Sequence, residues 1–144
     1  MGKLGLIFLT VLAGMSNAFQ APVNAALGRF VGVVESSCIS FSVGALSLLV
    51  VSLVAGKGSL LRIVDAPPIL WIGGFLGAFF VTVALFVVPK IGAAVMIASV
   101  LTGQMISALI IDQTGLLGIP KNPIDLYRIA GLACLVVGIK LLST

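Results

Sequence analysis

The chain has 144 residues, of which 60% are hydrophobic and 8% charged, and its formal net charge is +4. About a quarter of the residues in an ordinary soluble domain are charged, and a soluble core of this length cannot enclose so much apolar surface. The composition therefore excludes an ordinary soluble protein and predicts one integral membrane domain over residues 1–144.

The same composition argues against several classes of chemistry. The sequence has no histidine, and its two cysteines, Cys38 and Cys134, lie in apolar runs where they act as small hydrophobic residues. We therefore expect no metal site and no cofactor. The basic residues are scattered without a basic run, so nucleic acid is not an expected partner. No catalytic triad or phosphate-binding loop is found, and we do not expect an enzyme.

Hydropathy and helix-breaking residues divide the chain into five segments. Each is about as long as a helix needs to be to cross ~30 Å of hydrocarbon. The sequence therefore predicts an all-α integral membrane protein, a bundle of five transmembrane helices. The predicted helices are Leu4 to Leu27, Glu35 to Val54, Ile69 to Val88, Ile91 to Ile111, and Tyr127 to Leu142.

The connections contain most of the charged residues and the helix-capping signals. Asp65, followed by two prolines, is predicted to cap the third helix, and Asp125 the fifth. Only Pro89 and Lys90 separate the third and fourth segments, which predicts a tight hairpin or a broken helix.

The distribution of basic residues gives a weak preference for orientation. With a cytoplasmic N-terminus, that side has five Lys or Arg residues and the other side has three. The chain is therefore expected to favour a cytoplasmic N-terminus slightly, but could insert in both orientations. An odd number of spans places the two termini on opposite sides. Both features suit one half of an inverted-repeat transporter, with a second chain supplying the other half.

The first helix contains an unusual polar face. Asn17, Gln20 and Asn24 are three and four residues apart and so share one side of the helix, beside Pro22. Unpaired amides in hydrocarbon cost several kcal/mol each, so this face should avoid lipid, and the proline predicts a kink. Two interpretations stay open: the amides hold helices together, or they line a substrate cavity.

Other polar residues occur in the later helices. Ser36 and Ser40 belong to a stripe of small residues that predicts close packing of the second helix. Glu35 is either a coupling site for a cation or proton, or an exposed first-turn acid favoured by the helix dipole. Gln104 is a candidate for a buried polar contact. Asp112, at the membrane edge, is explained by capping or pairing with a basic residue, or is a second candidate coupling site.

Five stretches of the sequence resemble the bacterial YdcZ-like family of the drug/metabolite transporter superfamily, and together they cover nearly the whole chain. They are QAPVNAAL from Gln20, WIGGFLGAFF from Trp71, PKIGAA from Pro89, GQMISALIIDQTG from Gly103 and RIAGLACLVVG from Arg128. The resemblance implies a multi-pass protein of the bacterial inner membrane, related to one half of ten-helix exporters and working as an antiparallel pair.

The resemblance also implies which polar positions matter. It matches Gln20, Asn24, Gln104, Asp112 and Arg128 to polar positions of the family. The related small multidrug transporters use a mid-membrane Glu in their first helix, and this sequence has none there. A proton-coupled cation exporter of that kind is therefore not expected unless Glu35 takes that role.

The leading hypothesis is a secondary transporter that exports small metabolites or drugs by alternating access. Two five-helix chains would pack as an antiparallel homodimer, or as a heterodimer with a paralogous protein. The predicted substrate-binding residues are Gln20, Asn24, Asn17 and Gln104, and the sequence does not identify the substrate. The rival hypothesis is a non-transporting membrane subunit that binds another membrane protein. A passive channel would require a continuous polar stripe, which the sequence has only in patches.

Overall fold

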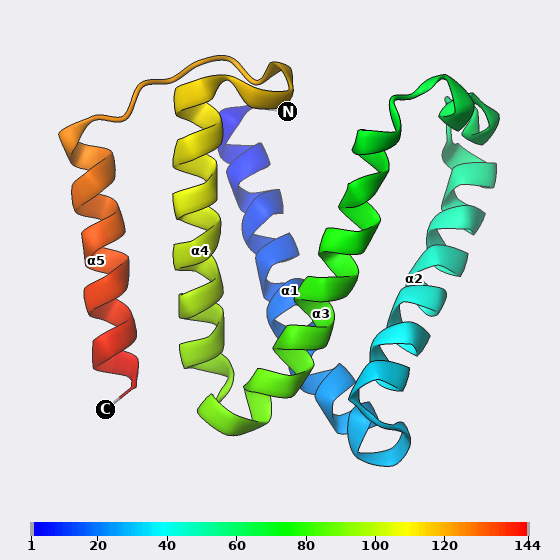
Figure 1. The fold of residues 1–144 in the computed structure, drawn as a ribbon, viewed down its shortest axis with the longest axis horizontal. Helices are drawn as coiled ribbons and strands as arrows, with labels where there is room; N and C mark the ends of the chain where they lie inside the picture. The colour runs from blue at the N-terminus through cyan, green and yellow to red at the C-terminus, as the bar shows by residue number, and fades with distance from the viewer. Residues whose placement is uncertain (1, 144) are drawn as a thin grey trace. The chain divides into compact units, whose positions relative to one another are not determined.

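The structure, a computed structural model, describes residues 2–143, apart from the side chain of Leu117. Every regular element in this part of the chain is helical, which confirms the all-α prediction. The α-helices are α1 (Lys3–Val31), α2 (Val33–Ala55), α3 (Ile72–Ile91), α4 (Ala93–Thr114) and α5 (Leu126–Leu142) (Figure 1). Three short 3-10 helices, η1 (Leu60–Asp65), η2 (Pro68–Trp71) and η3 (Leu116–Gly118), lie in the connections.

Four helical segments of the described chain are long and apolar enough to cross a membrane: α1, α2, α4 and the segment Pro68–Ile91, which joins η2 to α3. They have 22 to 29 residues. Helix α5 has 17 residues, which at 1.5 Å per residue gives about 25 Å, slightly less than the ~30 Å hydrocarbon core.

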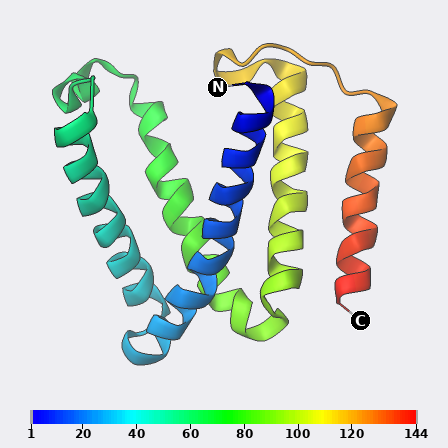
Figure 2. The ribbon, with the colours of Figure 1, turned by 180° about the vertical axis from the view of Figure 1, so that it is seen from behind.

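Contacts between Cα atoms group the chain into two compact units, Met1–Lys90 and Ile91–Thr144. In the first unit, α1 and α2 meet at Gly32 and diverge away from it (Figures 1 and 2). Helix α3 contacts α2 where Gly77 lies beside the ring of Phe41, since a Cβ on that glycine would be 3.2 Å from the ring. In the second unit, α4 and α5 run side by side in opposite directions (Figure 1).

Glycines with positive φ separate α1 from α2 and α3 from α4. Gly32 (φ 100°, ψ 154°) lies between α1 and α2, and Gly92 (φ 80°, ψ 161°) between α3 and α4. This region of backbone space is accessible essentially to glycine alone. The predicted break at Pro89 and Lys90 is therefore displaced: α3 continues through both residues to Ile91, and the helical backbone is interrupted at Gly92.

Two further local predictions have different outcomes. The Asp125 side chain accepts a hydrogen bond from the backbone N–H of Arg128, 2.8 Å away, and so caps α5 as predicted. The predicted cap of the third helix is wrong. Pro67 occupies the cap position of η2, and Asp65 instead lies 3.6 Å from Arg62 in an exposed ion pair.

Helix α1 continues without interruption through Pro22. Figures 1 and 2 both show its axis changing direction in its second half, as expected for a proline within a helix.

Most large apolar side chains of the described residues are exposed on the helix surfaces. The few buried apolar residues are Ala21, Val81, Ala84, Leu85, Val88, Met96 and Leu109. Such an apolar exterior is what lipid accommodates and water does not.

Gly32→Ala is expected to lower the free energy of unfolding by about 1–3 kcal/mol, because an L side chain is strained at φ 100°. Gly28→Ala is the matched control, since Gly28 lies within α1 and a Cβ there would make only ordinary contacts of 3.6–3.7 Å with Val33 and Ser36. The control should be neutral or more stable, as alanine favours helix. Thermal unfolding in detergent distinguishes them, and equal losses would contradict the assignment of Gly32 as the reversal point.

Candidate functional site

Asn24 joins α1 to α2. Its side chain is 7% exposed, and its Nδ2 donates a hydrogen bond to the Ser40 hydroxyl at 2.8 Å. The Ser36 hydroxyl, which is fully buried, donates to the backbone carbonyl of Asn24 at 2.7 Å. The predicted stripe of small residues on α2 therefore packs where α1 approaches it, and Asn24 holds the two helices together.

Asn17 and Gln20 precede Asn24 by seven and four residues in α1, so helical spacing puts them on the same face, farther from Gly32. Helices α1 and α2 diverge with distance from Gly32 (Figure 2). The side chains of Asn17 and Gln20 are exposed, and neither makes a hydrogen bond to another described residue. Gln104, on α4 in the second unit, is likewise exposed and without a hydrogen-bond partner within residues 2–143. On the amide face of α1, Asn24 therefore bonds to another helix, whereas Asn17 and Gln20 make no side-chain hydrogen bond within the described residues.

Glu35 occupies the first turn of α2 and is exposed. Its carboxylate folds back toward Gly32, because a Cβ built on that glycine would overlap it. A carboxylate at this end of a helix interacts favourably with the helix dipole. The arrangement fits the simpler of the two interpretations, an exposed first-turn acid, and a coupling role for Glu35 stays a prediction.

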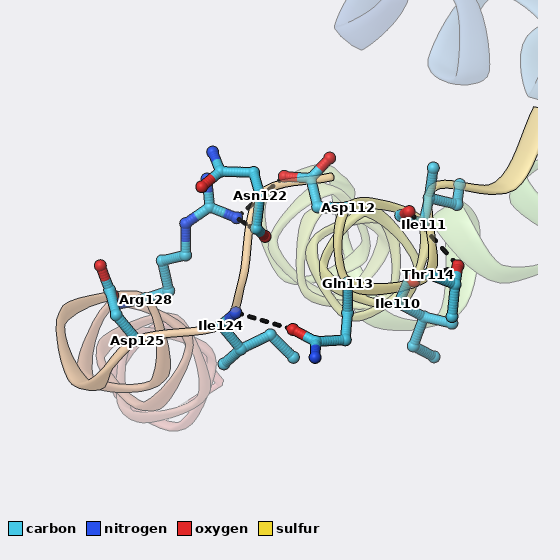
Figure 3. Close-up of polar contacts among 9 residues, drawn as sticks. All are labelled: Ile110, Ile111, Asp112, Gln113, Thr114, Asn122, Ile124, Asp125 and Arg128. Carbon is cyan, nitrogen blue, oxygen red and sulfur yellow. Dashed lines mark hydrogen bonds and ion pairs between the residues drawn. The ribbon is translucent and has the colours of Figure 1, made fainter. Parts of the chain in front are cut away.

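Asp112 and Arg128 form an ion pair between the end of α4 and the start of α5 (Figure 3). Arg128 Nη1 donates to Asp112 Oδ2 at 2.9 Å, and the arginine and aspartate side chains are 28% and 32% exposed. The predicted pairing of Asp112 with a basic residue is confirmed, and the partner is the arginine that the family resemblance also singled out.

The loop between α4 and α5 is tied to the last turn of α4 at two points. The backbone N–H of Asn122 donates to the Asp112 carbonyl at 2.9 Å, and the backbone N–H of Ile124 donates to Gln113 Oε1 at 2.9 Å (Figure 3). The sequence analysis did not single out Gln113 or Asn122. The only signal for them was an Asp-Gln pair at a helix end, followed by the turn-forming residues Asn122 and Pro123.

A cavity of about 470 Å³ lies beside the ion pair, between α4 and α5. Its charged end is formed by Asp112 and Arg128, and its remaining lining residues are Met105, Ala108, Leu109, Gly131, Leu132 and Leu135. A second cavity of about 540 Å³ lies near the end of α2, and its lining has no charged group. The α4–α5 cavity therefore combines a small-molecule volume with a polar end, the usual composition of a ligand site.

Removing one member of the ion pair should leave the other as an uncompensated, mostly buried charge. Asp112→Asn and Arg128→Gln are each expected to lower the free energy of unfolding by about 1–2 kcal/mol, allowing for their partial exposure. The double variant should lose clearly less than the sum of the two. A double-mutant cycle on thermal unfolding measures this coupling. Strict additivity would show that the pair does not form in solution.

A comparison with protein families shows where the chain belongs. Residues 5–141 match the family described as "Putative inner membrane exporter, YdcZ". Neither the curated proteins nor the solved structures include a match to the chain. The family match covers nearly the whole chain, and its helices have the length and apolar character that membrane crossing requires. This multi-pass inner-membrane protein therefore belongs to the YdcZ family of inner membrane exporters.

Proposed function

We propose that the chain is one half of a secondary transporter of the drug/metabolite transporter superfamily, exporting small metabolites or drugs by alternating access. A second five-helix chain of opposite orientation, identical or paralogous, supplies the other half. The observation that carries this proposal is the exposure of Gln20 and Gln104 on membrane-crossing helices, without a hydrogen-bond partner in the described chain. Because hydrocarbon cannot satisfy these amides, the proposal places them on a water-filled, substrate-accessible path.

In this proposal α5 is the fifth span. Its 17 residues are at the short end of the range found for membrane helices, about 17–25 residues. Local thinning of the bilayer accommodates such a helix at modest energetic cost. Five crossings put the N- and C-termini on opposite sides of the membrane, so an inverted partner is needed to complete a symmetric transporter.

The polar residues then have separate roles. Gln20 and Gln104, with Asn17 at the edge of the same face as Gln20, contact substrate. Asn24 fixes the α1–α2 hairpin through Ser40 and so positions Gln20 one turn away. Asp112 or Glu35 couples transport to an ion or a proton. Small, reorientable amides suit a site that binds substrate in two alternating states.

A substrate screen tests the proposal most simply. A ligand that binds only the folded protein raises its stability, by about 2.7 kcal/mol at a concentration 100 times its Kd. Purified protein should show such a shift in thermal unfolding with at least one small metabolite or drug. The same compound should then show counterflow in proteoliposomes that contain the protein. Stabilisation without counterflow would contradict transport.

Orientation gives a second test. C-terminal reporters that are active on only one side of the membrane should report both orientations for a homodimer. For a heterodimer they should report one orientation, together with an oppositely oriented paralogue that copurifies. A single orientation with a monomeric state and no copurifying paralogue would favour the rival function, a membrane subunit whose amides only hold helices, as Asn24 does.

A further inference from the structure

We propose that the groove between α4 and α5 binds one phospholipid with an amine-bearing, zwitterionic headgroup. The lipid phosphate binds Arg128, its ammonium binds Asp112, and one acyl chain lies along the apolar part of the groove. This inference goes beyond the proposed function and does not depend on it, since a transporter and a non-transporting subunit could both hold such a lipid.

The ion pair retains hydrogen-bonding capacity that the chain does not use. A guanidinium has five N–H donors, and a carboxylate has two oxygens that accept. The Arg128 guanidinium donates through Nη1 to Asp112 Oδ2 at 2.9 Å and to the Asn122 carbonyl at 3.5 Å. Within the described residues, its Nε and second terminal nitrogen donate to nothing, and Asp112 Oδ1 accepts nothing. Both side chains are about 30% exposed and so accessible to a ligand.

The groove is polar at one end and apolar along the rest of its length, as a phospholipid is. Asp112 is two residues from the end of α4, and Arg128 is the third residue of α5, so the charges lie at the helix ends, where headgroups are found. The lining continues inward to Met105 on α4 and Leu135 on α5. Each of these is seven residues farther along its helix, which corresponds to about 10 Å. The polar end therefore faces the interface, and the apolar wall extends into the membrane.

The charges around the groove favour a zwitterion over an anion. An isolated arginine would attract any phosphate, but the Asp112 carboxylate beside it opposes a ligand with net negative charge and attracts an ammonium. Asp125 adds a second carboxylate close by, bonded to the Arg128 backbone N–H. A choline headgroup carries the same net charge as ethanolamine but has no N–H to donate to Asp112 Oδ1. Ethanolamine phospholipid should therefore bind better than glycerol or choline phospholipids.

Native mass spectrometry of the purified full chain with mixed lipids tests this order. We expect ethanolamine phospholipid to be retained about tenfold over glycerol and choline phospholipids of the same chain length, as one charge-assisted hydrogen bond allows. Asp112→Asn should abolish the preference for ethanolamine over glycerol headgroups. Arg128→Gln should weaken retention of all three lipids. Arg62→Gln, which removes the exposed Arg62–Asp65 pair (81% and 67% exposed), is the matched control and should change nothing.

Three outcomes would overturn the proposal. The first is equal retention of the three lipids by the unmodified protein, a result that does not depend on whether the variants fold. The second is an unchanged preference for ethanolamine in Asp112→Asn together with undiminished retention of the lipids in Arg128→Gln. The third is full displacement of the lipid by soluble phosphoethanolamine, which has the headgroup and no acyl chain. That displacement would assign the site to a free small molecule instead of a lipid.

Discussion

Replacing Asn24 with leucine is expected to lower the free energy of unfolding by about 2–4 kcal/mol. The change removes the hydrogen bond to the Ser40 hydroxyl and leaves that hydroxyl without its partner. It also puts a branched apolar side chain at a position only 7% exposed, next to fully buried Ser36, where α1 and α2 have little room. At about 2–4 °C per kcal/mol, the midpoint of thermal unfolding in detergent should fall by roughly 5–15 °C.

Asn17→Leu is the matched control for this prediction, because Asn17 lies on the same helix, is exposed and makes no hydrogen bond to another described residue. It should leave the midpoint nearly unchanged or raise it. A double-mutant cycle with Asn24→Ala and Ser40→Ala should give a coupling of about 0.5–1.5 kcal/mol. Equal effects of leucine at residues 17 and 24 would show that Asn24 is not the residue that joins the helices.

Gln20→Leu and Gln104→Leu are expected to reduce counterflow of the transported compound by roughly 5- to 150-fold while the midpoint of thermal unfolding stays within about 2 °C. Neither amide bonds to another described residue, so the fold loses no hydrogen bond. Removing a side-chain amide that binds substrate costs about 1–3 kcal/mol of binding free energy, and each 1.4 kcal/mol is about a factor of ten in affinity. Transport should therefore fail while the protein remains folded.

Ser99→Ala is the control for the transport variants. Ser99 is also an exposed polar residue on α4, but its hydroxyl donates to the Val95 carbonyl of its own helix at 2.8 Å. Its replacement should preserve counterflow. Undiminished counterflow in both glutamine variants would remove Gln20 and Gln104 from the substrate path and leave the exposed amides without a transport role.

The helices could be predicted well from the sequence because a membrane permits so few alternatives. Backbone groups in hydrocarbon must bond within their own helix, so long apolar runs become helices and polar or glycine-rich stretches become connections. The exact reversal points were less predictable. The sequence predicted a break at Pro89 and Lys90, yet α3 passes through both, and the helical backbone is interrupted at Gly92. In a chain with 17 glycines, sequence alone does not show which glycine adopts positive φ.

The polar face of α1 shows a second limit. Helical spacing places Asn17, Gln20 and Asn24 on one side, but it does not show along how many turns of that side α2 stays in contact with α1. The close approach of α1 and α2 near Gly28, where a Cβ would meet Ser36 at 3.7 Å, brings Asn24 to Ser40. Beyond that point the helices diverge. Both interpretations of the face, packing and cavity lining, can therefore apply to one helix, at different turns.

The α4–α5 site shows a third limit. The position of Asp112 at the end of a helix predicted either capping or pairing with a basic residue, without identifying that residue. Arg128 is 16 residues away along the chain. It reaches Asp112 because Gln113 and Asn122 fasten the intervening loop to α4. Every residue except proline has a backbone N–H, so a single sequence does not show which loop residues donate hydrogen bonds. These two residues were therefore not predicted.

The central claim is that Gln20 and Gln104 face water within the membrane, and cysteine accessibility measures this without a known substrate. Cys38 and Cys134, both exposed and unpaired, are first replaced by alanine. Cysteines then placed at residue 20 or 104 should react with a membrane-impermeant maleimide in intact membranes. They should react at least tenfold faster than a cysteine replacing Val23, an apolar side chain 63% exposed on α1. Labelling at both positions no faster than at residue 23 would contradict the claim.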